Sequence, residues 1–199
     1  SVVTSFASAA EGAGASEADA FSSALKGLVE VVKDKAANLS DATANQADKL
    51  LDLTKAEDLT LIKTETSSQV ASIADIDVGS FNRVADDTAT AILNVNTKIA
   101  AVTDLTSDET KNTFSTVQVL AEQVKDAAEA ETTSEGSGSI SFTDPDAVDQ
   151  AAENAAPTDI ELSKSTISEE AISLVVGVLT TTDADQPTGE KFTYEIAQI

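Results

Sequence analysis

The 199-residue sequence contains no cysteine, histidine, tryptophan or methionine. Without cysteine there is no disulfide and no thiolate metal site, and without histidine the commonest zinc, copper and haem ligand is also missing. Neither a Gly-x-Ser-x-Gly motif nor a glycine-rich phosphate-binding loop is present. The sequence therefore favours a protein that is not an enzyme.

Aromatic side chains and long apolar runs are scarce as well. The six phenylalanines and one tyrosine make up 4% of the residues, which disfavours a carbohydrate-stacking surface or the aromatic-lined cleft of a glycosidase. No apolar run approaches the roughly 20 residues that span a bilayer, so we expect no membrane span. The first residue is serine rather than methionine, and we expect a processed or excised product.

Acidic side chains dominate, with 35 Asp and Glu against 12 Lys and Arg and a formal net charge of −23. Residues 139–199 hold 12 acids and 2 bases, so their charge density is about twice that of residues 1–138, with 23 acids and 10 bases. Such a polyanion repels nucleic acid and anionic lipid. It attracts hard cations such as Ca²⁺, which take oxygen ligands, although the same charge also promotes solubility.

Residues 1–133 predict an antiparallel α-helical bundle, because side chains that can face a core recur at spacings of three and four. A short helix is expected to end at Gly12. Four main helices are expected to begin at cap residues. The predicted stripes are Phe21, Leu25, Leu28, Val32, Ala36 and Leu39 after Ser16; Leu59, Ile62, Thr66, Val70 and Ile73 after Thr54; Phe81, Val84, Thr88, Ile92, Val95, Ile99 and Val102 after Asp77; and Phe114, Val117, Leu120, Val124 and Ala128 after Thr106.

Residues 134–156 predict a Gly/Ser linker and a short helix. Residues 140–142 are expected to form a short strand, and Asp144 followed by Pro145 is typical of a helix start. The Asp-x-Asp pairs at 75/77 and 144/146 each precede a predicted helix, so helix capping explains them better than metal binding. Arg83, the one arginine, is interpreted as a surface cation.

Residues 157–199 predict β-structure. Ile160 and Leu162 alternate with polar residues, residues 174–179 form a denser apolar run, and residues 191–196 alternate with a period of two. Three strands make at most half of a β-sandwich, and their open edges would need another segment or another copy to cover them.

The order of motifs in residues 154–199 resembles the opening of a bacterial cadherin-like repeat. It begins Asn-Ala-Ala-Pro-Thr-Asp-Ile-Glu-Leu, continues with Ile-Ser-Glu-Glu, and then with Thr-Asp-Ala-Asp-Gln. The resemblance implies an α+β chain, in which the helical bundle is followed by the first strands of a cadherin-like (Ig-like) sandwich. It also implies a Ca²⁺ site at the β junction, with ligands Glu169, Glu170, Asp183 and Asp185, and with Asn154 and Asp159 nearby. Solvated turn residues are the alternative explanation of these acids.

The sequence therefore predicts a structural or adhesive segment of a secreted bacterial surface protein, located outside the cell or on its surface. Its expected partners are copies of itself, joined by strand complementation into a filament or matrix, or other cell-surface components. The alternatives are a flagellin-like or pilus-like filament subunit with a helical core, and a binding module for a carbohydrate or protein.

Overall fold

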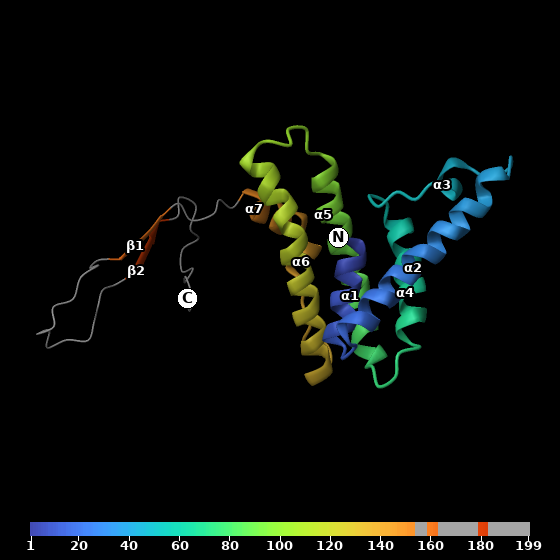
Figure 1. The fold of residues 1–199 in the computed structure, drawn as a ribbon, viewed down its shortest axis with the longest axis horizontal. Coiled ribbons are helices and arrows are strands. Elements are labelled where there is room, and N and C mark those ends of the chain that lie inside the picture. Colours follow the sequence, from blue (N-terminus) through green and yellow to red (C-terminus); the bar gives the residue numbers. More distant parts are fainter. Residues whose placement is uncertain (154–158, 163–178, 183–199) are drawn as a thin grey trace, which may run out of the picture. The chain divides into compact units, whose positions relative to one another are not determined.

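The computed structural model describes residues 1–153, 159–162 and 179–182, which belong to two units, Ser1–Glu153 and Asn154–Ile199 (Figure 1). The described part of the first unit is helical. Its α-helices are α1 (Val2–Gly12), α2 (Glu17–Ala37), α3 (Gln46–Lys49), α4 (Ala56–Val70), α5 (Val78–Ala100), α6 (Asp108–Thr133) and α7 (Pro145–Glu153), and its 3₁₀ turns are η1 (Asn38–Ser40) and η2 (Ser141–Thr143).

The predicted α+β fold with a cadherin-like sandwich is wrong. The described strands of the second unit are β1 (Asp159–Leu162) and β2 (Leu179–Thr182), each four residues long. They pair antiparallel with each other, with Asp159 opposite Thr182 and Leu162 opposite Leu179. Two such short strands form a ribbon rather than a sandwich, because a sandwich needs two sheets that face each other across a core. The fold of the described residues is therefore helical.

Helix α1 lies at the centre of the first unit, where it contacts α2, α5 and α6 (Figure 1). A largely apolar helix needs neighbours on most of its sides, and α1 buries both Phe6 and its alanines against them. Gly12 permits a close approach of α1 to α6, because a Cβ at this position would lie 2.7 Å from the Cβ of Ala128 on α6. The predicted short helix ending at Gly12 is confirmed.

Two antiparallel helix pairs, α2 with α4 and α5 with α6, pack around α1. The predicted stripes of α4 and α5 face the core over most of their length, although Ile73, Ile99 and Val102 at their ends are only partly buried. The stripe of α6 is buried only in its C-terminal half. The fully buried stripe members are Leu59, Ile62, Thr66 and Val70 on α4, Phe81, Val84, Thr88, Ile92 and Val95 on α5, and Leu120, Val124 and Ala128 on α6.

The predicted stripe of α2 is the exception, since most of it is exposed to solvent. Its buried positions lie one residue earlier at each step, at Ala20, Ala24, Gly27 and Val31, and Ser23 joins them. One residue corresponds to about 100° around a helix. The prediction was therefore wrong about which side of α2 faces the core, although it placed the helix itself correctly.

The capping predictions succeeded at Ser16 and Asp77 and failed at two threonines. Ser16 Oγ accepts from the Asp19 N–H at 3.2 Å, and Asp77 Oδ1 accepts from the Ser80 N–H at 3.1 Å. Thr54 and Thr106 instead donate their hydroxyls to Asp52 and Asp104, two residues earlier, at 2.6 and 2.7 Å. Each Asp forms a local turn that engages the Thr, so each helix starts one residue later than predicted.

The segment after α6 turns back onto the bundle. Residues 140–142, predicted as a strand, include part of the 3₁₀ turn η2. Asn94 Nδ2 donates to the carbonyls of Phe142 and Thr143 at 2.9 and 3.0 Å, which holds η2 against α5. Asp144 Oδ1 accepts from the Asp146 N–H at 3.0 Å at the start of α7, so the predicted cap before Pro145 is confirmed.

Candidate functional site

The residues proposed as calcium ligands lie almost entirely outside the described part of the chain. Asn154, Glu169, Glu170, Asp183 and Asp185 fall in the ranges that the structure does not describe, and Asp159 is the first residue of β1. Within residues 1–153, 159–162 and 179–182, no group of three or more Asp or Glu side chains is arranged to hold a metal ion. The calcium site stays a prediction.

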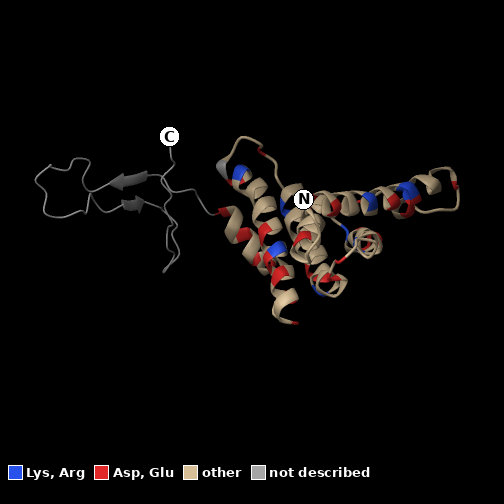
Figure 2. Cartoon of the chain, turned by 60° about the horizontal axis from the view of Figure 1, so that its bottom comes forward, with Lys and Arg blue, Asp and Glu red and all other residues tan. Residues whose placement is uncertain are grey.

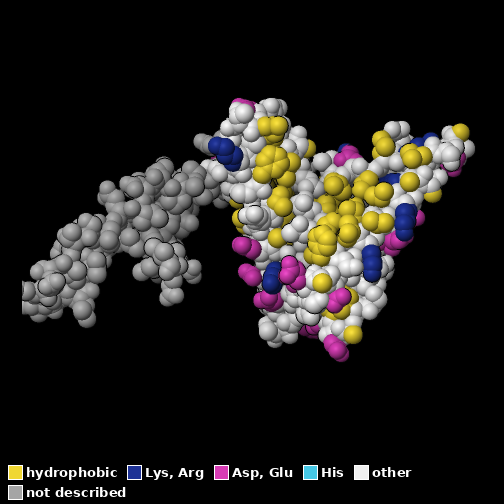
Figure 3. All heavy atoms as spheres, in the orientation of Figure 1, with side chains coloured by type: hydrophobic (Ala, Val, Ile, Leu, Met, Phe, Trp, Pro, Cys, Tyr) yellow, Lys and Arg dark blue, Asp and Glu magenta, His cyan; other side chains and the backbone are white. Residues whose placement is uncertain are grey.

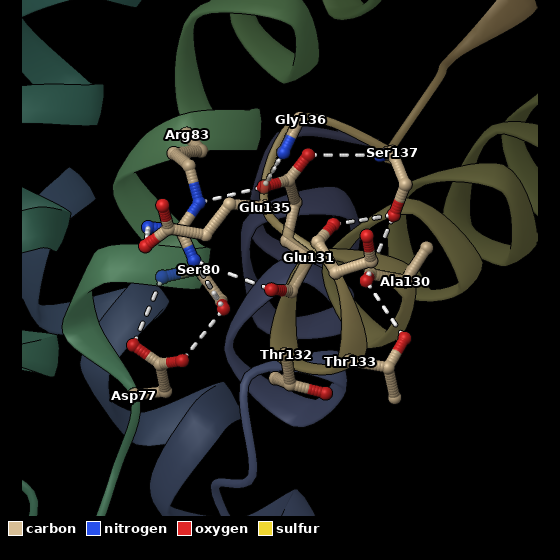
Figure 4. Close-up of polar contacts among 12 residues, drawn as sticks. Asp77, Ser80, Arg83, Ala130, Glu131, Thr132, Thr133, Glu135, Gly136 and Ser137 are labelled. Carbon is tan, nitrogen blue, oxygen red and sulfur yellow. Dashed lines mark hydrogen bonds and ion pairs between the residues drawn. The ribbon is translucent and has the colours of Figure 1, made fainter.

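The most connected polar cluster joins α5 to the C-terminal end of α6 (Figure 4). Arg83 Nε donates to Glu131 Oε2 at 2.6 Å, and Arg83 Nη2 donates to Ser80 Oγ at 3.0 Å. The Glu131 carboxylate also accepts from the Gly136 and Gly138 N–H groups, both at 2.8 Å. Arg83 is exposed, as predicted, and it is paired with the buried Glu131.

This network stabilises the ionised form of Glu131, whose side chain is 4% exposed. The N–H donors of Gly136 and Gly138, followed by Arg83, lower the pKa of the Glu131 carboxyl below its usual range. A carboxylate whose acceptor sites are filled by backbone donors is well placed to fix a turn, and poorly placed to exchange protons with a substrate. Gly136 adopts φ +74°, which allows the turn to fold over Glu131.

A second ion pair joins the partly buried Lys35 in the last turn of α2 to the buried Asp58 in the first turn of α4. Lys35 Nζ lies 2.6 Å from Asp58 Oδ1 and donates to the Ala47 carbonyl at 2.5 Å. The other oxygen of Asp58 accepts from the Asp52 N–H at 2.6 Å. Together these bonds fix the 38–55 connection to the bundle. A hollow of about 830 Å³ lies beside them, and its lining combines apolar residues such as Leu50, Leu51 and Leu61 with charged ones such as Lys55 and Glu57.

An apolar surface lies along α2 (Figure 3). Phe21 is 51% exposed and Leu25 is 42% exposed. Val29 and Val32 are exposed as well, and Leu28 is half-buried. We call these five residues the outer face of α2. Leu39 in η1 continues the exposed apolar surface beyond the end of the helix.

The inner face of α2, made of Ala20, Ser23, Ala24, Gly27 and Val31, explains this orientation. A Cβ at position 27 would lie 2.7 Å from the Thr66 backbone nitrogen, so α2 and α4 are in close contact at Gly27. Only a face of small residues allows two helices to approach so closely. The larger side chains of the outer face do not fit against α4, and they point outward.

Charges are unevenly distributed along α2 (Figure 2). Its first turn carries Glu17 and Asp19, whereas Lys35 lies in its last turn, with Lys33 just before it and Glu30 and Asp34 near these lysines in the sequence. Lys33 Nζ lies 2.6 Å from Glu30 Oε1 on the same helix. In the C-terminal half of α2, Lys33 and Lys35 balance Glu30 and Asp34, so this half is less acidic than the first turn.

None of the helices described in the structure is both long enough and apolar enough to cross a bilayer.

No protein-family model, curated protein or solved structure matches this chain.

Proposed function

We propose that this chain is a structural and adhesive segment of a secreted bacterial surface protein, that it assembles with copies of itself, and that it is not an enzyme. The observation that carries the proposal is the outer face of α2, where large apolar side chains remain exposed while alanines and a glycine are buried. Exposed contiguous apolar surface on a soluble unit is typical of an interaction site.

Two ion pairs that each include a buried carboxylate support a static role for the helical unit. Arg83–Glu131 and Lys35–Asp58 each join segments that are far apart in the sequence, and backbone groups satisfy the remaining acceptors of both carboxylates. Such pairs favour one arrangement of the helices. They supply a rigid frame that holds the outer face of α2 in place.

The cadherin-like motifs of residues 154–199 support the extracellular setting and the use of calcium. We propose that Glu169, Glu170, Asp183 and Asp185, with Asn154 and Asp159, bind Ca²⁺ at the start of this segment. Metal that binds only the folded form raises stability with its concentration. Strand complementation by this segment remains a second proposed route of assembly, separate from the helical unit.

Isothermal titration of the full chain with Ca²⁺ tests the metal proposal. We expect binding that is lost when Asp183→Asn and Asp185→Asn are combined and that is kept when Asp75→Asn and Asp86→Asn are combined. Asp75 and Asp86 lie in the helical unit, and no group of carboxylates among the described residues is arranged to hold a metal ion. Equal heats for wild type and for the Asp183/Asp185 double variant would remove these two ligands from the proposal.

The flagellin-like or pilus-like alternative places the terminal helices of a subunit in a fibre core. Helix α1 buries Phe6 and its alanines within its own unit instead, so it has no apolar side left to offer to a fibre. This observation weighs in favour of the surface-protein proposal.

Sedimentation velocity of the full chain from about 1 to several hundred μM, with and without millimolar Ca²⁺, tests self-assembly. We expect the weight-average sedimentation coefficient to rise with concentration. Leu25→Lys should weaken association about 100-fold, because each copy would lose a buried leucine and gain a charge. The matched control is Val119→Lys on α6, a position 39% exposed, which should associate like wild type. A chain that stays monomeric under all conditions would overturn the proposed function.

A further inference from the structure

We propose that the outer face of α2 pairs with the same face of a second copy, and that the two α2 helices run antiparallel. This inference rests on the proposed self-assembly and specifies its contact. A second copy is the partner that the charges on α2 favour, because the first turn is acidic and the last turn carries Lys35, with Lys33 just before it. An antiparallel pair brings each acidic end beside a lysine-bearing end.

The spacing of the outer face suits helix pairing. Phe21, Leu25, Leu28 and Val32 follow each other at intervals of four, three and four, which is the repeat of a coiled-coil seam. A two-fold axis between Leu25 and Leu28 places Phe21 against the partner's Val32 and Leu25 against the partner's Leu28. Every large side chain of the seam then meets another apolar side chain, and the contact is isologous.

Glu17 and Lys35 determine the direction of the pair. They are 18 residues apart, or about five helical turns, so they lie on the same side of α2 next to the seam. In the antiparallel arrangement each Glu17 faces the partner's Lys35. In a parallel arrangement the two acidic first turns would lie at the same end of the pair, where their charges repel each other. Antiparallel helix dipoles favour the same choice.

Lys35 can accept this second partner because its ammonium has three donors. Two are used by Asp58 Oδ1 and by the Ala47 carbonyl, which leaves one N–H for the partner's Glu17. The existing ion pair also orders the Lys35 side chain, so less side-chain entropy is lost when the second carboxylate binds. Lys35 therefore serves both the fold of one copy and the contact between two.

The outer face covers a few hundred Å² at most, which is smaller than the ~800 Å² per partner of a standard interface. We therefore expect a weak contact, with a dissociation constant on the order of micromolar to tens of micromolar. Lipid is a poorer occupant, because the net charge of −23 opposes an anionic bilayer.

The absence of cysteine allows a direct test with single cysteines in the full chain. We would mix ¹⁵N-labelled Phe21→Cys protein with unlabelled Val32→Cys protein, oxidise the mixture in glutathione buffer, and quantify the three disulfide-linked species by mass. Both positions are exposed, and circular dichroism checks that each variant keeps the wild-type helix content. The control replaces Phe21→Cys by Phe114→Cys on α6, a phenylalanine of similar exposure.

The mixed disulfide should exceed either homodisulfide at least tenfold. In the antiparallel pair the two copies of position 21 lie about 16 Å apart along the axis, beyond the roughly 4.4–6.8 Å between Cα atoms that a disulfide allows. Predominant homodisulfides, or equal cross-linking by Phe114→Cys, would overturn the antiparallel pairing. If wild type associates by sedimentation and these cysteines do not cross-link, only the pairing fails. If wild type does not associate, the proposed function fails as well.

Discussion

Helices α2 and α5 carry the same kind of apolar periodicity, and the structure places them in opposite ways. On α5 the stripe that contains Phe81, Val84 and Ile92 faces the core. On α2 the stripe that contains Phe21, Leu25 and Val32 faces solvent. The difference lies in the residues beside each stripe, because α2 has a second face of alanine and glycine that packs closely on α4. The apolar period therefore locates each helix in the sequence, whereas the close packing of α2 on α4 decides which side of α2 faces the core.

Truncating one phenylalanine in each helix gives the largest predicted contrast. Phe81→Ala should lower the free energy of unfolding by about 3–5 kcal/mol, because it removes a fully buried ring and leaves a cavity. Phe21→Ala should change it by less than about 1 kcal/mol, since the ring is 51% exposed. Urea titration followed by circular dichroism, at concentrations below association, measures both. Similar losses in the two variants would show that Phe21 is a core residue.

Enlarging the inner face of α2 should also destabilise the unit. Gly27→Ala places a methyl group against the Thr66 backbone, and we expect a net loss of about 1–2 kcal/mol, because overpacking outweighs the gain in helix propensity. Lys26→Ala, on the exposed side of the same turn, is the control and should be nearly neutral. A Gly27→Ala variant more stable than wild type would mean that α2 and α4 are farther apart than described.

Acid should weaken the α5–α6 connection through Glu131. Its folded-state pKa is lowered below the ordinary value of 4.5, first by the N–H groups of Gly136 and Gly138 and then by Arg83. A lowered carboxyl pKa contributes stability that is complete above about pH 4.5 and is lost as the pH falls through the folded-state value. Glu131→Gln should therefore be less stable than wild type at pH 7, and the difference should shrink below pH 4.5. Urea midpoints at pH 7, 5 and 3 provide the measurement, and a difference independent of pH would contradict it.

The Asp-x-Thr turns should give the smallest effect. Hydrogen bonds from the Thr54 and Thr106 hydroxyls, followed by those from their backbone N–H groups, lower the pKa values of Asp52 and Asp104. Thr54→Val and Thr106→Val should raise each pKa toward its ordinary value and leave the helix content unchanged. Carboxyl-detected NMR titration measures the shift, and Thr60→Val, whose hydroxyl bonds the Ala56 carbonyl instead, is the control. An unchanged pKa for Asp52 in Thr54→Val would exclude the hydroxyl as its cause.

The sequence was sufficient for the positions of the main helices, because strong caps and a period near 3.6 coincide at Ser16 and Asp77. It was insufficient for the rotation of α2. The stripe of larger apolar side chains was predicted to face the core, whereas the close contact between Gly27 and Thr66, which lie far apart in the sequence, decides which side of α2 does so. Thr54 and Thr106 were wrongly predicted to cap helices, although the Asp two residues before each indicated a local turn. The network around Glu131 depends on tertiary contacts that the separate motifs of Arg83 and residues 134–139 do not predict.

The rotation of α2 is the central claim, and thiol labelling tests it most directly. In the cysteine-free chain, Val32→Cys and Ala24→Cys would each be reacted with a maleimide at low and high protein concentration. We predict fast labelling of Val32→Cys in dilute solution, slower labelling when the protein is concentrated enough to associate, and slow labelling of Ala24→Cys throughout. Faster labelling at position 24 than at position 32 would contradict the account, because the larger apolar stripe would then face the core.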